Sequence, residues 1–174
     1  MNRRVVITCV GAVTALGNNW QEIRSALLKK ENAVRYMQEL EQFQGLCTKL
    51  AAVVTDFKVP EHYTRKKIRS MSPVSLYAFR ATEFALEDAG LLGDPVLGSG
   101  RTGIAYGSCA GGMQAMVNFS SMLTEHSTAN IDGTTYVKMM PHTAAVNTAI
   151  FFGLKGRLIP TSSACTSGSQ AIGS

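Results

Sequence analysis

The chain has 174 residues, of which 45% are hydrophobic and 17% are charged, which is enough apolar material for one compact core and excludes a disordered chain. After the N-terminal stretch, no apolar run approaches the ~20 residues that a membrane-spanning helix needs, so we expect no membrane association. The four cysteines are widely spaced and form no CxxC pair, which disfavours a zinc site and a dense disulfide framework. Reduced thiols of this kind predict a cytoplasmic protein.

Positive charge is concentrated in the first part of the chain. Residues 1–70 contain 12 of the 17 Lys and Arg residues and 6 of the 12 Asp and Glu residues, a net charge of +6, whereas the remainder carries −1. A basic region favours an acidic partner. Nucleic acid is disfavoured as that partner, because no predicted helix combines regular Arg and Lys with aromatic residues that stack on bases.

The N-terminal part of the chain predicts a strand, a loop and a helix. Residues 5–10 are apolar without alternation, as in the buried strands of parallel sheets. A secretory signal peptide is the alternative, but the stretch continues directly into residues 19–30, which have the spacing of an amphipathic helix. The expected apolar face of this helix is Trp20, Ile23, Leu27 and Leu28. Residues 31–48 are expected to be irregular, and residues 49–54 to form a second strand.

Strands and helices alternate through the rest of the chain. Ser72 and Pro73 are typical of a helix start, and this helix is expected to run to about Asp88. Its expected buried residues are Val74, Tyr77, Ala78, Ala81, Ala85 and Leu86. Strands are predicted at residues 101–106 and 158–161, with helices at about 112–126, from 141 onward and at the end of the chain. This alternation predicts an α/β fold with a mostly parallel sheet covered by helices on both faces.

Cys165 is the residue with the clearest chemical potential. It follows the last predicted strand, among small residues that lead into a helix. A helix N-terminus stabilises a thiolate, and its unpaired N–H groups can hold an oxyanion. The alternative is a buried, inert cysteine at a tight turn, and position alone does not separate the two.

Several segments occur in an order that is typical of one family. They are residues 4–8, 11–17, 75–91, 107–112, Asn147, 153–156 and 163–168. Together they resemble the β-ketoacyl-acyl-carrier-protein synthases of the elongating type II kind, in the thiolase superfamily. The resemblance implies a thiolase-like fold, of which residues 1–174 form the N-terminal half of one condensing-enzyme domain, incomplete at the C-terminus.

The resemblance implies a ping-pong condensation. Cys165 would accept an acyl chain from an acyl carrier protein, and malonyl-carrier protein would then lose carbon dioxide and attack the acyl-Cys165 carbonyl, in fatty-acid or polyene biosynthesis. Two histidines and a lysine of the family site are expected beyond residue 174, so residues 1–174 alone are expected to be inactive. No metal and no cofactor are implied, and His62, His126 and His142 are expected to be ordinary surface or polar core residues.

Three further residues are assigned by the resemblance. Lys66 and Arg69 align with the family's basic positions for docking the acidic carrier protein, although a solvated charged turn is the alternative. Ala110 stands where the elongating enzymes often carry a larger aliphatic residue, which predicts a wider acyl pocket. A homodimer or a heterodimer with a related subunit is expected. Two alternatives for the function remain open: a non-catalytic partner subunit that sets chain length, and an inactive fragment.

Overall fold

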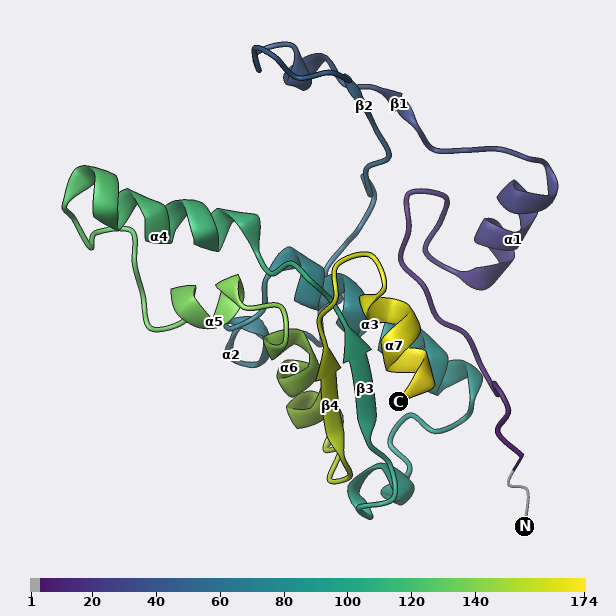
Figure 1. Ribbon diagram of the computed structural model, residues 1–174. Coiled ribbons are helices and arrows are strands. Elements are labelled where there is room, and N and C mark those ends of the chain that lie inside the picture. Colours follow the sequence, from purple (N-terminus) through teal and green to yellow (C-terminus); the bar gives the residue numbers. More distant parts are fainter. Residues whose placement is uncertain (1–3) are drawn as a thin grey trace.

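A pair of parallel strands lies at the centre of the computed structural model, which describes residues 4–174. Strand β3 (Ile104–Gly107) pairs with β4 (Leu158–Thr161), with Ile104 opposite Leu158 and Gly107 opposite Thr161. Helices α6 (Thr143–Phe152) and α7 (Ser167–Gly173) pack against both strands and lie to either side of them in Figure 1. The strands predicted at residues 101–106 and 158–161, and the helix predicted at the end of the chain, are thus confirmed.

Helix α3 (Pro73–Asp88) packs against α6. It begins as predicted, because the Ser72 hydroxyl caps it by accepting a hydrogen bond from the Ser75 N–H at 3.3 Å. The predicted buried face is only partly correct: Tyr77, Ala78, Ala81, Ala85 and Leu86 are half-buried, and none of the predicted residues is fully buried. The buried residues are Ser75, Phe79 and Glu83, which are spaced by one helical turn, whereas Val74 is 37% exposed. The aromatic cluster that α3 contacts decides which face turns inward.

That aromatic cluster forms the core. Phe79 is fully buried, and its ring lies 4.2 Å from that of Phe151, 4.9 Å from Phe152 and 4.7 Å from Tyr63, measured between centroids. Edge-to-face and offset contacts of this kind add to the hydrophobic gain of burial. The cluster joins α3, the end of α6 and the segment before α2 (Arg65–Ile68).

The strand predicted at residues 5–10 is absent from the described chain. These residues are extended but make no ladder, and Val5, Val6 and Ile7 are 95%, 66% and 85% exposed. The apolar run is suited to a strand, but a strand also needs a neighbour for its backbone N–H and C=O groups, and none of residues 4–174 supplies one. The strand predicted at 49–54 is reduced to β2 (Leu50–Ala51), which pairs antiparallel with β1 (Arg35–Tyr36) in a region expected to be irregular.

Helix α1 (Trp20–Leu28) begins where predicted. Asn19 caps it by accepting a hydrogen bond from the Glu22 N–H at 2.9 Å. Its expected apolar face is only partly correct: Ile23 and Ala26 are buried, whereas Trp20, Leu27 and Leu28 are exposed.

The remaining elements lie away from the strand pair. Helix α4 (Met113–Glu125) has nearly the predicted bounds, and it packs against α5 (Thr135–Met139), a short helix in a stretch where none was expected. Figure 1 shows both to the left of β4. Two 3₁₀ turns complete the fold, η1 (Gln38–Leu40) and η2 (Pro95–Gly98). Across residues 4–174, no helix is long and apolar enough to cross a membrane.

Candidate active site and basic hollow

Cys165 lies in the turn between β4 and α7, with its side chain exposed. Within residues 4–174, the thiol is therefore not buried. β4 ends at Thr161 and α7 begins at Ser167, so the turn is short and both of its ends are held by the strand pair and the helix packed on it. Within the described residues, this arrangement leaves the thiol exposed beside packed elements.

Hydroxyl groups fix the shape of this turn. The Ser167 hydroxyl is buried, accepts a hydrogen bond from the Ser163 N–H at 2.9 Å and donates one to the Ala164 carbonyl at 2.7 Å. The Thr166 hydroxyl donates to the Ser163 carbonyl at 2.8 Å, and that of Thr161 to the Ser167 carbonyl at 2.8 Å. Beyond the end of β4, hydrogen bonds from Ser and Thr side chains around Cys165 thus take the place of the backbone hydrogen bonds between strands.

The residue before the cysteine has an unusual backbone conformation. Ala164 has a φ of 52°, in the left-handed region that residues other than glycine rarely occupy. Such strain persists only where the surroundings impose it, and it is concentrated at functional sites. The Ser167 hydroxyl and N–H both donate to the Ala164 carbonyl, at 2.7 and 3.2 Å, and these bonds hold the turn in this conformation.

Gly107 brings β3 into direct contact with the turn. A Cβ atom at this position would lie 2.6 Å from the Gly168 nitrogen and would overlap the Ser167 carbonyl. A side chain is therefore incompatible with the observed packing of α7 against β3. Gly107, the first residue of the glycine-rich segment 107–112, is thus required by the packing of α7 against β3.

Ala110 follows β3 at the same end of the strand pair from which the Cys165 turn departs. The Ser108 N–H donates to the Thr161 carbonyl at 3.1 Å, and the Ser108 hydroxyl donates to the Ala110 carbonyl at 2.9 Å. Ala110 is exposed. Because β3 and β4 are parallel, both loops leave from one edge of the sheet, as in sites built at the carboxyl ends of strands.

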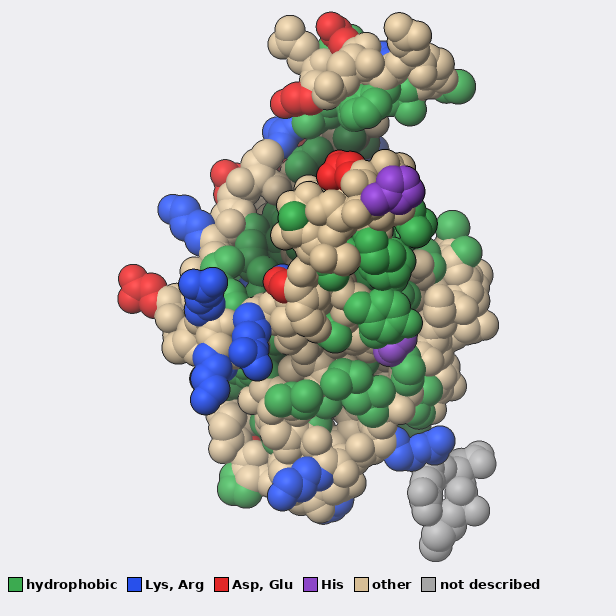
Figure 2. Space-filling view, turned by 90° about the vertical axis from the view of Figure 1, so that its left-hand side faces the viewer, with side chains coloured by type: hydrophobic (Ala, Val, Ile, Leu, Met, Phe, Trp, Pro, Cys, Tyr) green, Lys and Arg blue, Asp and Glu red, His purple; other side chains and the backbone are tan. Residues whose placement is uncertain are grey.

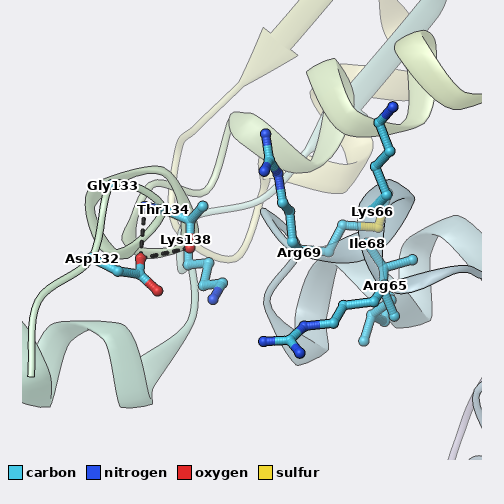
Figure 3. Close-up of a pocket in the computed structure, with 10 residues that line it drawn as sticks. Arg65, Lys66, Ile68, Arg69, Asp132, Gly133, Thr134 and Lys138 are labelled. Atoms are coloured by element: carbon cyan, nitrogen blue, oxygen red, sulfur yellow. Dashed lines mark hydrogen bonds between the residues drawn. The ribbon is translucent and has the colours of Figure 1, made fainter.

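A second feature is a basic hollow of about 970 Å³. Helix α2 and the residue after it supply Arg65, Lys66 and Arg69 to its lining, and the segment around α5 supplies Lys138 and Asp132. Figure 3 shows the two groups from these separate parts of the chain on facing sides of the hollow. Figure 2 shows Lys and Arg side chains gathered on one side of the face that it presents.

The single carboxylate of this group is already engaged. Asp132 accepts hydrogen bonds from the Thr134 hydroxyl and N–H, both at 2.7 Å. These bonds lower the pKa of Asp132, since they stabilise its charged form. Four cations therefore share the hollow with one carboxylate whose hydrogen bonds are made locally.

Sequence reasoning identified Lys66 and Arg69 but missed Lys138. No spacing rule connects positions so far apart, and these residues come together only because the folded chain places all three in the lining of one hollow. Residues 4–174 contain no group of three or more His, Cys, Asp and Glu side chains arranged to hold a metal ion.

The sequence matches the family described as "Beta-ketoacyl synthase, N-terminal domain" over residues 2–174. The chain belongs to this family, which confirms the resemblance seen in its motifs. The thiolase-like α/β fold is confirmed as well, because the similar solved structures are ketosynthases.

Relatives by sequence and by structure agree on this assignment. A 3-oxoacyl-[acyl-carrier-protein] synthase 2 of Vibrio harveyi is 30% identical over 98% of the chain, and a synthase 1 of Buchnera aphidicola is 26% identical over 98%. A β-ketoacyl synthase structure from Burkholderia phymatum is 52% identical, with a TM-score of 0.93 over 99% of the chain. A type II PKS ketosynthase in complex with its acyl-carrier protein has a TM-score of 0.79 at 24% identity, which shows the fold alone. The chain spans only 41–42% of the length of the first three proteins.

The contact at Gly107 gives a first prediction. In the full-length protein, Gly107→Ala should lower the free energy of unfolding by about 1–3 kcal/mol through overpacking. It should also change the rate at which iodoacetamide alkylates Cys165, because α7 must move. Gly168→Ala is the matched control, since a Cβ there meets no atom within 4 Å. Unchanged alkylation and stability in Gly107→Ala would contradict the packing described.

Proposed function

We propose that the full-length protein is a β-ketoacyl-acyl-carrier-protein synthase with Cys165 as its nucleophile. The observation that carries the proposal is an exposed cysteine, in a turn held by hydroxyl groups at a strand end, in a chain of this family. The relatives named above as 3-oxoacyl-[acyl-carrier-protein] synthases support the reaction class.

The proposed reaction has two stages. The Cys165 thiolate attacks the carbonyl carbon of an acyl thioester, the C–S bond to the carrier breaks, and the carrier leaves as a thiolate, so that a new thioester forms on the Cys165 sulfur. Malonyl-carrier protein then loses carbon dioxide, and the resulting carbanion attacks the acyl-Cys165 carbonyl. The C–S bond breaks and returns the thiolate. The backbone N–H of Cys165 would stabilise the oxyanion.

Removal of the thiol tests the first stage. Full-length protein incubated with a carrier protein that is loaded with an acyl chain should gain the mass of one acyl group on Cys165, measured by mass spectrometry of its peptides. Cys165→Ala should gain none. Cys109→Ala is the matched control, because Cys109 is also exposed and lies in the neighbouring loop after β3, and it should be acylated normally. An acyl adduct retained in Cys165→Ala would refute the assignment.

The alternative functions predict different outcomes. A chain-length-setting partner subunit would not form the acyl adduct, and the presence of Cys165 disfavours this role. A ketosynthase/chain length factor structure shares the fold, with a TM-score of 0.67, but at 19% identity it supports nothing more specific.

The proposed assembly is a dimer formed along the edge of β4, in which the second subunit is either a copy or a related chain.

Carrier docking is proposed for the basic hollow, with Lys66 and Arg69 as its central residues and Lys138 as a further contributor. All three line the hollow, and both α2-side residues are exposed. Acyl carrier proteins are acidic, and complementary charge steers and orients such a partner. The type II PKS ketosynthase solved with its carrier protein supports a partner of this kind.

Charge reversal tests the docking site. Lys66→Glu and Arg69→Glu should each weaken binding of the carrier protein by about tenfold, mainly through a slower association rate. Lys138→Glu should act in the same direction. Arg101→Glu, an exposed reversal outside the hollow, controls for net charge and should have little effect. The measurement is association and dissociation kinetics at two salt concentrations, and equal losses in all four variants would count against a localised site.

Ala110 is proposed to widen the acyl pocket. It is exposed in the loop beside the Cys165 turn, where a larger aliphatic side chain would occupy more space. Ala110→Ile should reduce kcat/KM for a rigid, conjugated acyl-carrier substrate by about tenfold or more, while a straight saturated chain loses less. Equal losses with both substrates would exclude a role in acyl selectivity.

A further inference from the structure

Away from the Cys165 turn, the carboxylate of Glu83 has three side-chain partners. It lies on the buried face of α3 with only 3% of the residue exposed. The Tyr63 hydroxyl donates to Oε2 at 2.6 Å, Nε2 of His62 lies 2.7 Å from Oε1, and the Arg80 guanidinium contacts Oε2. Burial opposes ionisation, but these partners outweigh it and hold the pKa of Glu83 below its usual value.

Two of these partners belong to the segment that carries the basic residues. His62 and Tyr63 immediately precede α2, and Tyr63 is itself buried against the Phe79 ring. The other end of the segment is held by the Ser70 hydroxyl, 3.0 Å from Oδ1 of Asn147 on α6. Between them, Nζ of Lys67 lies 4.7 Å from the centroid of the Phe151 ring. The segment is thus fastened to α3 and α6 at its start, middle and end.

These attachments divide the basic residues by role. Lys67 uses its charge on an aromatic ring of the core, and Arg80 uses its charge on Glu83. Arg65, Lys66 and Arg69 are exposed and line the hollow. A buried ion pair contributes little net stability relative to an apolar packing, but it fixes geometry, and breaking it is costly.

We propose that Glu83 is a positioning residue for carrier docking: through His62 and Tyr63, it holds α2 so that Lys66 and Arg69 face the partner. This inference rests on the docking role proposed above for those two residues. Glu83 does not touch the carrier. It keeps the segment ordered before the carrier binds, so that less conformational entropy is lost on binding. Affinity is thereby raised, although Glu83 takes no part in the chemistry.

The experiment compares Glu83→Gln with Glu87→Gln in the full-length protein. Glu87 lies one turn further along α3 and is exposed, which makes it a matched control. The first readout is limited trypsin cleavage at residues 65–69, where the enzyme's own target side chains report local order. The second is binding of the carrier protein, together with the KM and kcat of Cys165 acylation.

Glu83→Gln should speed cleavage within residues 65–69 by about tenfold and weaken carrier binding three- to tenfold, raising KM with kcat unchanged. Glu87→Gln should change neither. Tyr63→Phe keeps the ring and removes only the hydroxyl, so it should shift both readouts in the same direction by less, and it carries the test if Glu83→Gln fails to fold. Unchanged cleavage, or a loss confined to kcat, would overturn the inference. If the wild-type protein binds no carrier, the docking proposal fails, and the cleavage readout alone then decides whether Glu83 anchors the segment.

Discussion

The close contact between β3 and the start of α7 is the constraint on which the site depends. Gly107 ends β3 and touches the backbone of Ser167 and Gly168, and the same strand end pairs with Thr161 of β4. The turn between β4 and α7 is therefore held from both sides. Its position relative to the loop that contains Ala110 follows from that one packing, because both loops leave the parallel pair at its carboxyl end.

Much of the architecture could be predicted from the sequence where local signals decide it. The amphipathic spacing from residue 19 and the Ser72–Pro73 pair placed two helix starts correctly, and the strand predicted at residues 158–161 is β4. Faces and partners could not be predicted in this way. Apolar spacing favoured Val74 for the core of α3, but the aromatic rings of Phe151 and Phe152, supplied by α6, select the face of Phe79 and Glu83 instead. The strand expected at residues 5–10 likewise depends on a partner distant in sequence, and residues 4–174 supply none.

The two candidate sites differ in how far they could be predicted. Cys165 lies within a local motif, so its turn could be identified from neighbouring residues, although the left-handed backbone of Ala164 could not. The basic hollow is assembled from α2 and α5. The sequence predicted the docking residues Lys66 and Arg69 on the α2 side, but not Lys138 on the α5 side. The burial of Glu83 could not be predicted for a further reason. The periodicity of a helix predicts that a charged residue is exposed unless its partners are known.

The hydrogen bonds that shape the cysteine turn have a consequence for how this chemistry is inherited. Those described run among residues 161–167, so a short contiguous stretch of sequence determines the geometry of the turn, and one glycine on a neighbouring strand makes room for it. Substitutions elsewhere, in the loop that contains Ala110 or on α2, leave that stretch intact. A lineage can therefore exchange the groups that choose substrates and partners while the reacting atom stays where it is.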